Sequence, residues 1–452
     1  MTHNAAAATG LPLVASASSA EAKARLAQIS RRSDLLEQLG RGSDSPLAQV
    51  MVILEEVRRD GDKALVRLAR DLDGAAISQV GVPIEELARA WDALAPAQRA
   101  ALEAARSNIR RFQEAIYGES SKMVAGFGRQ LEMRLVPVRR VGLYVPGGRA
   151  AYPSSVLMAA IPARVAGVGE IVVCTPPDKH GNPHPSILAA CHLAGIKEVH
   201  RAGGAQAIAA MAYGTATIKP VDLIVGPGNQ YVTHAKRLVY GQVGIDQLAG
   251  PTELVIIADE TARADWVAAD LLAQAEHDPH AACVLLTLAP TLGDQVVAEL
   301  QRQLATLPTA ETCRAALSQY GLVAVCADVD EAAAVAESLA PEHLEVHTRA
   351  PESVAAKVPS AASTFVGPFA PEAAGDYVSG PSHVLPTGGT ARFTSGLSVH
   401  SFLVRKNRIT YQREGLLNEA ASIVAFARLE GMEAHARSTE IRLAEPAAPV
   451  SA

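Results

Sequence analysis

Two polar side chains stand three residues apart at the end of a predicted helix, where they could bind a metal ion. The segment 265–279 has apolar residues at helical spacing, and Pro279 prevents the helix from continuing. Gln274 and His277 therefore share one face of the last turn. An imidazole and an amide oxygen can both bind a metal, although an amide is an unusual ligand. A helix end with a capping histidine is the alternative interpretation.

A second pair of chemically capable residues, Glu342 and His343, lies between a predicted helix and a predicted strand. A carboxylate beside a histidine can act as an acid/base pair, because histidine titrates near neutral pH. The alternative is a helix-end histidine with an exposed glutamate. The Gly- and Pro-rich segment 371–389 adds an acid, Asp376, and a histidine, His383. Irregular segments of this length within a compact domain are often functional.

Composition limits the classes of protein to which the chain can belong. Its 452 residues suit two to four domains, and 49% are hydrophobic, enough for sizeable cores. The net charge of -6 and the lack of a basic patch argue against nucleic-acid binding. Five scattered cysteines indicate reduced thiols in a cytoplasmic protein, so a zinc site would need His, Asp, Glu or Gln ligands. No apolar run is long enough to span a membrane.

The elements that must position these residues follow from the hydrophobic period. Residues 1–20 are predicted to be a disordered tail, with a signal peptide as the alternative. Residues 21–116 are predicted to be helical and to serve as a scaffold or an oligomer surface. From residue 130 strands alternate with helices, and the predicted strands are 131–138, 141–145, 170–174, 198–201, 221–225, 253–258, 282–288, 322–326, 344–348 and 363–367. Residues 398–412 show no clean period, and a helix is predicted for 414–429.

Glycine-rich turns follow three of the predicted strands, at residues 146–148, 203–206 and 226–229. If the strands are parallel, these turns meet at one edge of the sheet, where open α/β folds bind their ligands. Backbone N–H groups at the starts of helices suit a pyrophosphate. The pattern G-x-G-x-x-G is absent, so plain turn chemistry stays an alternative to a dinucleotide site.

Taken together, these segments resemble the histidinol dehydrogenase family, zinc- and NAD-dependent enzymes of histidine biosynthesis. The likeness spans residues 20 to 443, in order and without large gaps. The matching stretches are VGLYVPGG (141–148), GGAQAIAA (203–210), VGPGNQYV (225–232), AGPTE (249–253), DLLAQAEHDP (270–279), PEHL (341–344), AGDYVSGPSHVLPT (374–387) and EGMEAH (430–435).

The resemblance implies an α/β fold of two incomplete Rossmann-like domains with helical N-terminal and C-terminal extensions. Its expected division is an N-terminal tail and extension at 1–40, a zinc-binding and catalytic domain at 41–143 and 252–395, an NAD-contacting domain at 144–251, and a C-terminal extension at 396–452. The family forms an intertwined homodimer, in which the C-terminal extension of one subunit completes the active site of the other.

Carried over residue by residue, the family pattern assigns a role to each matching position. The zinc ligands it implies are Gln274, His277, Asp376 and His435. Glu342 and His343 match the acid/base pair. The NAD-contacting positions are Tyr144, Gln206 and Asn229. Substrate contacts fall on Thr252, Gln274, His277, His343, Asp376, Glu430 and His435, with Glu430 and His435 supplied by the partner subunit.

The reaction that the resemblance implies is the oxidation of L-histidinol to L-histidine through the aldehyde, with two NAD+ in turn. Many family members have serine where this chain has Thr252, and segment 398–412 is less typical than the rest. One alternative is therefore a related dehydrogenase of another small alcohol, such as sulfopropanediol. A catalytically inactive homologue is a second alternative, although every candidate ligand is retained. A nucleotide-binding regulatory module is disfavoured, because it would not need Asp376 and His435.

Overall fold

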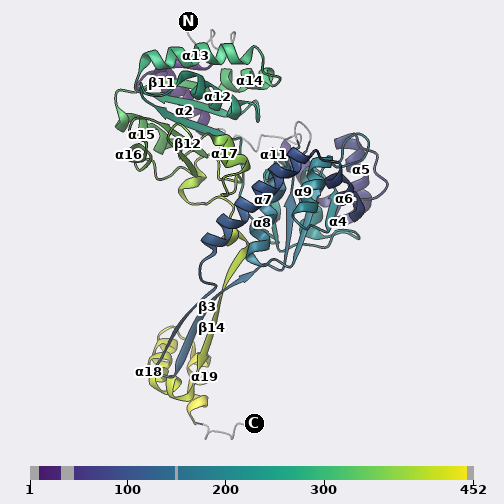
Figure 1. Cartoon of the computed structure of the whole chain (residues 1–452). Helices are drawn as coiled ribbons and strands as arrows, with labels where there is room; N and C mark the ends of the chain where they lie inside the picture. Colours follow the sequence, from purple (N-terminus) through teal and green to yellow (C-terminus); the bar gives the residue numbers. More distant parts are fainter. Residues whose placement is uncertain (1–9, 32–44, 148–150, 445–452) are drawn as a thin grey trace. The chain divides into compact units, whose positions relative to one another are not determined.

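The computed structural model describes residues 10–31, 45–147 and 151–444. Helices and strands alternate through most of the chain, which confirms the predicted α/β class (Figure 1). The chain divides into two compact units, Met1–Ile116 with Arg139–Phe402, and Tyr117–Val138 with Leu403–Ala452. Within the described ranges, no helix combines the length and apolar character needed to cross a bilayer.

The first unit contains a parallel six-stranded sheet with the strand order β1-β11-β10-β9-β12-β13. Its strands are β1 (Leu13–Ser16), β9 (Glu253–Ala258), β10 (Ala282–Thr287), β11 (Gly321–Val325), β12 (His343–His347) and β13 (Ser363–Val366). Strand β1 corrects the prediction of a disordered tail over residues 1–20: Leu13 turns into the core and its strand pairs with β11. The part of that prediction covering residues 1–9 lies outside the described residues.

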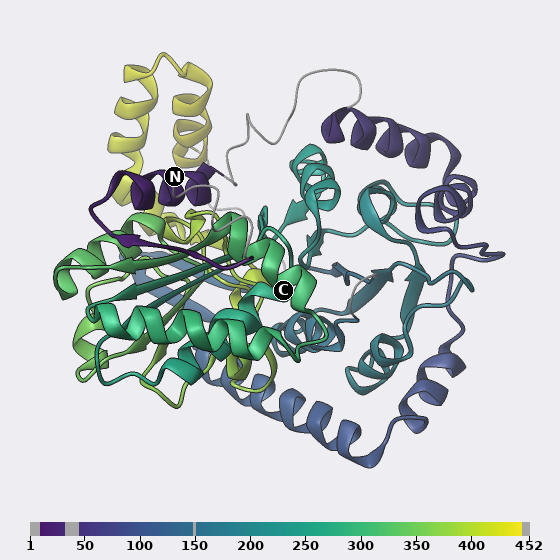
Figure 2. The same cartoon turned by 90° about the horizontal axis from the view of Figure 1, so that it is seen from above.

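Helices cover both faces of this sheet, so both sets of alternating side chains are buried (Figures 1 and 2). One face packs against α12 (Ala264–Ala275), α13 (Pro290–Leu304) and α14 (Ala310–Tyr320). The other packs against α2 (Ala20–Arg31), α15 (Val329–Leu339) and α16 (Pro351–Ala355). Such burial explains why β9 and β10 appear in the sequence as continuous apolar runs. Residues 32–44 of the region predicted to be helical lie outside the described residues.

A second parallel sheet lies in the same unit and has the order β6-β5-β4-β7-β8. Its strands are β4 (Arg140–Tyr144), β5 (Glu170–Thr175), β6 (Glu198–Arg201), β7 (Leu223–Val225) and β8 (Gly244–Ile245). The connecting helices are α8 (Pro153–Ala166), α9 (Pro185–Leu193), α10 (Gly204–Tyr213) and α11 (Gln230–Val239). Strands followed by helices and then by parallel strands are the units expected of a nucleotide-binding sheet.

The N-terminal helices belong with this second sheet. Helices α4 (Pro46–Asp60) and α5 (Asp62–Asp73) share an apolar core with α10 and α11, and α6 (Ile84–Asp92) packs against α9. The long helix α7 (Pro96–Tyr117) follows α6. The expected division placed residues 41–143 in the zinc-binding domain, and the observed packing of α4, α5 and α6 differs from it. Helical periodicity predicts which face of a helix is buried, but not which sheet buries it.

The second unit is a small α/β assembly that sequence patterns predicted only in part. Strands β2 (Ser121–Gly126), β3 (Arg129–Pro137) and β14 (Leu403–Tyr411) form an antiparallel sheet, joined by α18 (Arg413–Leu429) and α19 (Glu433–Ala444). The sequence predicted β3 and α18, but not β2, β14 or α19. All six residues of β2 and all but the first of β14 are exposed, so neither strand shows the alternation that one buried face produces. The C-terminal extension is therefore not purely helical.

Candidate active site

Strand β12 brings a row of polar side chains into the interior of the first unit. Alternate residues of a strand point to opposite faces, so His343, Glu345 and His347 share one face of β12. All three are buried, whereas Leu344 and Val346 point into the apolar core on the other face. Buried polar groups must find partners. Those partners come from helix α12 and from α17 (Glu372–Tyr377).

The candidate metal ligands meet at the end of α12. Gln274 lies on its last turn, His277 follows the helix end, and Asp376 lies on α17. His277 Nε2 is 3.5 Å from a carboxylate oxygen of Asp376. The bond to Asp376 raises the pKa of His277. Burial acts to raise the pKa of Asp376, but His277 and the nearby His383 outweigh it and hold the pKa below its usual value.

A buried carboxylate, Glu372, completes this group. Ligand atoms of His277, Glu372 and Asp376 lie within 4.8 Å of one another. The amide orientation of Gln274 that satisfies its neighbours puts its nitrogen 2.8 and 2.9 Å from the two oxygens of Glu372, and its oxygen 2.7 Å from Thr252 Oγ1. Imidazole nitrogen and carboxylate or amide oxygen are donors that zinc accepts, so the donor set fits a zinc ion.

Glu372 was missing from the sequence-based assignment. It precedes Asp376 by four residues, and residues at this spacing share one face of a helix. A short helix within segment 371–389 would have revealed the pair, but the neighbouring glycines and prolines favoured an irregular segment. His383, from the same segment, contacts the carbonyl oxygen of Asp376 through Nδ1 at 3.0 Å and the hydroxyl of Ser155 through Nε2 at 3.2 Å.

The predicted acid/base pair adjoins this group. The carboxylate of Glu342 accepts hydrogen bonds from the hydroxyl of Thr252 and from the backbone N–H of Glu253, the latter at 3.0 Å. Burial raises the pKa of Glu342 to about 7, although both hydrogen bonds act to lower it. A carboxyl group that titrates near neutrality can give and take protons at physiological pH.

His343 is held as a neutral base. Its Nδ1 lies 3.2 Å from the carbonyl oxygen of Glu253 and 3.6 Å from the carboxylate of Glu372. A carbonyl oxygen only accepts, so Nδ1 carries the hydrogen and Nε2 keeps its lone pair. Burial lowers the pKa of His343, which keeps the ring uncharged. The ring can therefore take up a proton at Nε2.

The residues assigned to NAD lie at the carboxyl ends of strands in the five-stranded sheet. The hydroxyl of Tyr144, the last residue of β4, accepts a hydrogen bond from Gly204 N–H at 3.1 Å. Gln206, on the first turn of α10, donates from Nε2 to Asp73 at 3.3 Å. Asn229 caps α11 by accepting from the N–H groups of Tyr231 and Val232, at 3.0 and 3.2 Å.

The glycine-rich turns converge at that edge, as predicted for parallel strands. A Cβ added at Gly147 or Gly203 would lie 2.8 or 2.7 Å from the ring of Pro176, so both turns pack against one residue. A Cβ at Gly226 would lie 2.1 Å from the carbonyl oxygen of Tyr144, too close for any other residue at that position. Gly148 lies outside the described residues.

Thr252, Gln274, His277, His343 and Asp376, all predicted to contact substrate, are thus gathered in the first unit. Glu430 and His435 belong to the second unit, where Glu430 ends α18 and His435 lies in the first turn of α19. Both side chains are exposed. Their participation in the site is part of the proposal below.

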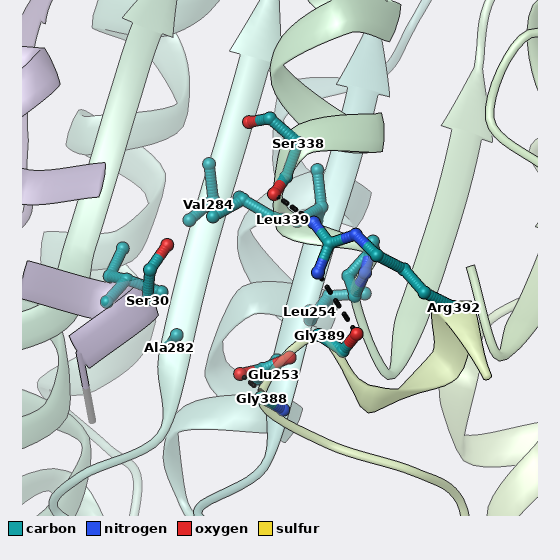
Figure 3. Close-up of a pocket in the computed structure, with 13 residues that line it drawn as sticks. Ser30, Glu253, Leu254, Ala282, Val284, Ser338, Leu339, Gly388, Gly389 and Arg392 are labelled. Carbon is teal, nitrogen blue, oxygen red and sulfur yellow. Dashed lines mark hydrogen bonds between the residues drawn. The ribbon is translucent and has the colours of Figure 1, made fainter. Parts of the chain in front are cut away.

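The structure also contains a cavity of about 230 Å³ (Figure 3). It is lined by the starts of β9 and β10, the ends of α2 and α15, and Arg392. Glu253 lines it and accepts a hydrogen bond from Gly388 N–H at 3.1 Å, while Arg392 donates to the carbonyl oxygens of Gly389, at 3.0 Å, and Ser338. None of the predicted ligands or acid/base residues lines this cavity.

Comparison with known proteins agrees with this geometry. The family profile described as histidinol dehydrogenase matches residues 39–443. A histidinol dehydrogenase of Parasynechococcus marenigrum is 47% identical over 423 residues, which cover 94% of this chain and 96% of the relative. One of Moorella thermoacetica is 49% identical over 397 residues, which cover 87% and 94% of the two chains. The crystal structure of histidinol dehydrogenase from Elizabethkingia anophelis matches with a TM-score of 0.84 at 36% identity, over 92% of this chain and 96% of that one.

Proposed function

The chain belongs to the histidinol dehydrogenase family, and we propose that it oxidises L-histidinol to L-histidine through the aldehyde, with two NAD+ in succession. One observation carries the proposal: the hydroxyl of Thr252 contacts both the acid/base residue Glu342 and the candidate metal ligand Gln274. A proton-transfer pair and a metal-binding group thus adjoin one another, which is the arrangement that oxidation of a metal-held alcohol requires.

The zinc site of this proposal consists of Gln274, His277 and Asp376, with His435 from the partner subunit as the fourth ligand. When bound, zinc holds and orients the imidazole and amine of the substrate, and NAD+ accepts the hydride. Glu372 contributes by holding the amide of Gln274. Tyr144, Gln206 and Asn229 bind NAD+ at the edge of the five-stranded sheet.

The protein groups then carry the protons. In the first oxidation, Nε2 of His343 takes the proton of the substrate hydroxyl as the carbonyl forms. In the second, a water molecule adds to the aldehyde carbon while Glu342 takes its proton, and His343 accepts the proton of the resulting hydrate as it is oxidised. Each oxidation therefore releases one proton in addition to the reduced NAD, and the acid product releases another.

The assembly of this proposal is a homodimer in which Glu430 and His435 act in the site of the partner. The second unit carries large apolar side chains that are exposed in the single chain, among them Phe127 at 84% and Leu429 at 82%. Exposed apolar groups of this size are typical of surfaces that a partner covers. A twofold dimer would bury the same surface on both copies.

All five cysteines are buried free thiols, consistent with the cytoplasm.

A single assay tests the function. NAD+ reduction is followed with L-histidinol and with sulfopropanediol, before and after treatment with a chelator and after zinc is restored. The proposal expects two NADH per L-histidinol, loss of activity with the chelator and recovery with zinc. Turnover of sulfopropanediol in preference to L-histidinol would instead favour the related dehydrogenase. Activity that the chelator leaves unchanged would contradict the role of zinc.

A further inference from the structure

The five-stranded sheet lacks a free carboxylate at the position where dinucleotide-binding folds commonly have one. In such folds an acidic side chain at the end of the second strand accepts hydrogen bonds from a ribose. Here β5 is the second strand, and Asp178 follows it by three residues. Its Oδ1, however, accepts from the backbone N–H groups of His180 and Asn182, at 2.8 and 3.0 Å. Asp178 is exposed and closes its own turn.

Another carboxylate reaches the same edge from outside the sheet. Asp73 is the last residue of α5, and Gly74 ends the helix with a φ of 65°. One oxygen of Asp73 accepts from Gln206 Nε2 at 3.3 Å. The other faces the start of α10, because a Cβ added at Gly203 would lie 3.3 Å from Asp73 Oδ1. The carboxylate thus lies beside Gly203 and Gln206. Both belong to the edge of the five-stranded sheet where the glycine-rich turns meet and where NAD+ is proposed to bind.

The charge of Asp73 is poorly compensated by the protein. Burial raises its pKa to about 6, and the only group that opposes this shift is the neutral amide of Gln206. Within the described part of the chain, that amide is also its hydrogen-bond partner, and it occupies one oxygen. A half-buried carboxylate without a cation costs free energy, so its retention here calls for hydrogen donors from elsewhere. A second anion, such as a phosphate, would add repulsion, whereas neutral hydroxyl groups would not.

We propose that Asp73 is a nucleotide-binding residue, whose carboxylate accepts hydrogen bonds from the vicinal hydroxyls of a ribose of NAD+. The inference rests on the proposed function, since it assumes that NAD+ binds at this edge. A ribose offers two adjacent O–H donors, and a carboxylate offers two acceptor oxygens. If the ribose is that of adenosine, Asp73 also discriminates against NADP+, because the 2′-phosphate would meet the carboxylate.

The test compares two Asp→Asn substitutions in the zinc-loaded enzyme, Asp73→Asn and the control Asp178→Asn. Asparagine keeps an acceptor for Gln206 and for the turn, so both variants should keep the wild-type melting temperature. Isothermal titration measures binding of NAD+, NADP+, AMP and nicotinamide mononucleotide. We expect Asp73→Asn to weaken NAD+ binding roughly 10-fold or more, as for loss of a hydrogen bond to a charged group, and Asp178→Asn to leave it unchanged.

The two mononucleotides identify the ribose. If Asp73→Asn weakens binding of AMP and improves binding of NADP+, Asp73 contacts the adenosine ribose. If it weakens binding of nicotinamide mononucleotide instead, Asp73 contacts the nicotinamide ribose. If Asp73→Asn binds both mononucleotides as tightly as the wild type does, the inference is overturned.

A second measurement does not depend on the folding of the variant. For the adenosine ribose, 2′-deoxy-AMP should bind the wild-type enzyme more weakly than AMP does. The adenosine assignment is wrong if the wild-type enzyme binds the two equally.

Failure of the inference is distinct from failure of the proposed function. A wild-type enzyme that binds NAD+ and oxidises L-histidinol, paired with an Asp73→Asn variant of equal NAD+ affinity, removes only the role of Asp73. A wild-type enzyme that binds no NAD+ contradicts the function itself.

Discussion

Glu372 determines which end of the Gln274 amide is free. Both carboxylate oxygens of Glu372 lie within 2.9 Å of the amide nitrogen, so the amide oxygen turns away from Glu372 and toward Thr252. Only the oxygen of an amide can bind a metal ion, because its nitrogen has no available lone pair. Thr252 has one hydroxyl hydrogen, which it can donate either to Glu342 or to this oxygen. The amide oxygen has two lone pairs, so one is left for the metal in either case. This contact explains how an amide, otherwise an uncommon zinc ligand, can serve in the site.

Replacing Glu372 with glutamine should therefore weaken zinc binding. The new side chain could accept from Gln274 with its oxygen, but its NH2 group is a donor, so one of the two bonds would be lost and the Gln274 amide would no longer be fixed. We expect the zinc dissociation constant to rise about 10- to 100-fold, as for other groups that orient metal ligands. Competition with a chromophoric chelator measures it directly. Glu352→Gln, at an exposed position on α16, is the matched control. Equal zinc affinity in all three proteins would show that Glu372 does not orient the ligand.

Replacing Glu342 with glutamine should separate the two oxidations. Glutamine keeps an acceptor for Thr252 and Glu253 but cannot take a proton from water. Aldehyde oxidation, which requires water, should slow by about 100-fold or more, while alcohol oxidation retains His343 as its base and changes much less. The two steps are measured with L-histidinal and L-histidinol in single-turnover experiments. Equal loss in both steps would contradict this division of roles.

The two parallel sheets could be predicted from the sequence because burial on both faces leaves a strong local signal. Strands such as β9 and β10 are short apolar runs between helical segments. Strands β2 and β14 could not be predicted, because their side chains are exposed. The partner of β14 is also distant in sequence, since Arg405 pairs with Leu135. Hydrogen bonds between strand backbones hold this sheet, and they leave no hydrophobic period.

The candidate site shows the same limit. Residue type and spacing predicted Gln274 and His277 on one face of a last helical turn, but α12 ends at Ala275 and His277 lies just beyond it. The structure adds that Asp376 reaches His277 from α17. That meeting depends on how α17 packs against α12 and β12, which no local pattern encodes. Glu372 and Asp73 went unnoticed for the same reason: each acts through a contact with a glutamine that is distant in sequence.

A cluster of buried acids should give the protein a measurable pH dependence. His347 Nε2 lies 3.2 Å from Glu345 and 3.9 Å from Asp270, and burial together with the charge of Glu345 raises the pKa of Asp270 to about 8. Between its unfolded value of roughly 4 and its folded value, the folded state holds a proton that the unfolded state releases. The contribution of Asp270 to stability is therefore lost progressively as pH rises through this window.

Asp270→Asn removes that titration, because asparagine imitates the protonated carboxyl. The variant should unfold like the wild type near pH 4 to 5 and gain relative stability up to pH 8, by at most about 1.4 kcal/mol per pH unit. Denaturant unfolding across this range measures the difference. Asp294→Asn, at an exposed position on α13, should show no such trend. A stability difference that does not change with pH would mean that Asp270 is ionised throughout.

Exchange of His435 between subunits can be tested by complementation. His277 lies in the first compact unit and His435 in the second, on the exposed first turn of α19. His277→Ala and His435→Ala homodimers should each be inactive, because every site lacks a ligand. In a mixed dimer, purified with two different affinity tags, one site loses both histidines and the other keeps both if His435 acts in the partner's site. Such a dimer should recover about half of the wild-type activity, as one of two symmetric sites is intact. If His435 instead serves its own subunit, both sites of the mixed dimer lack one ligand and the dimer stays inactive.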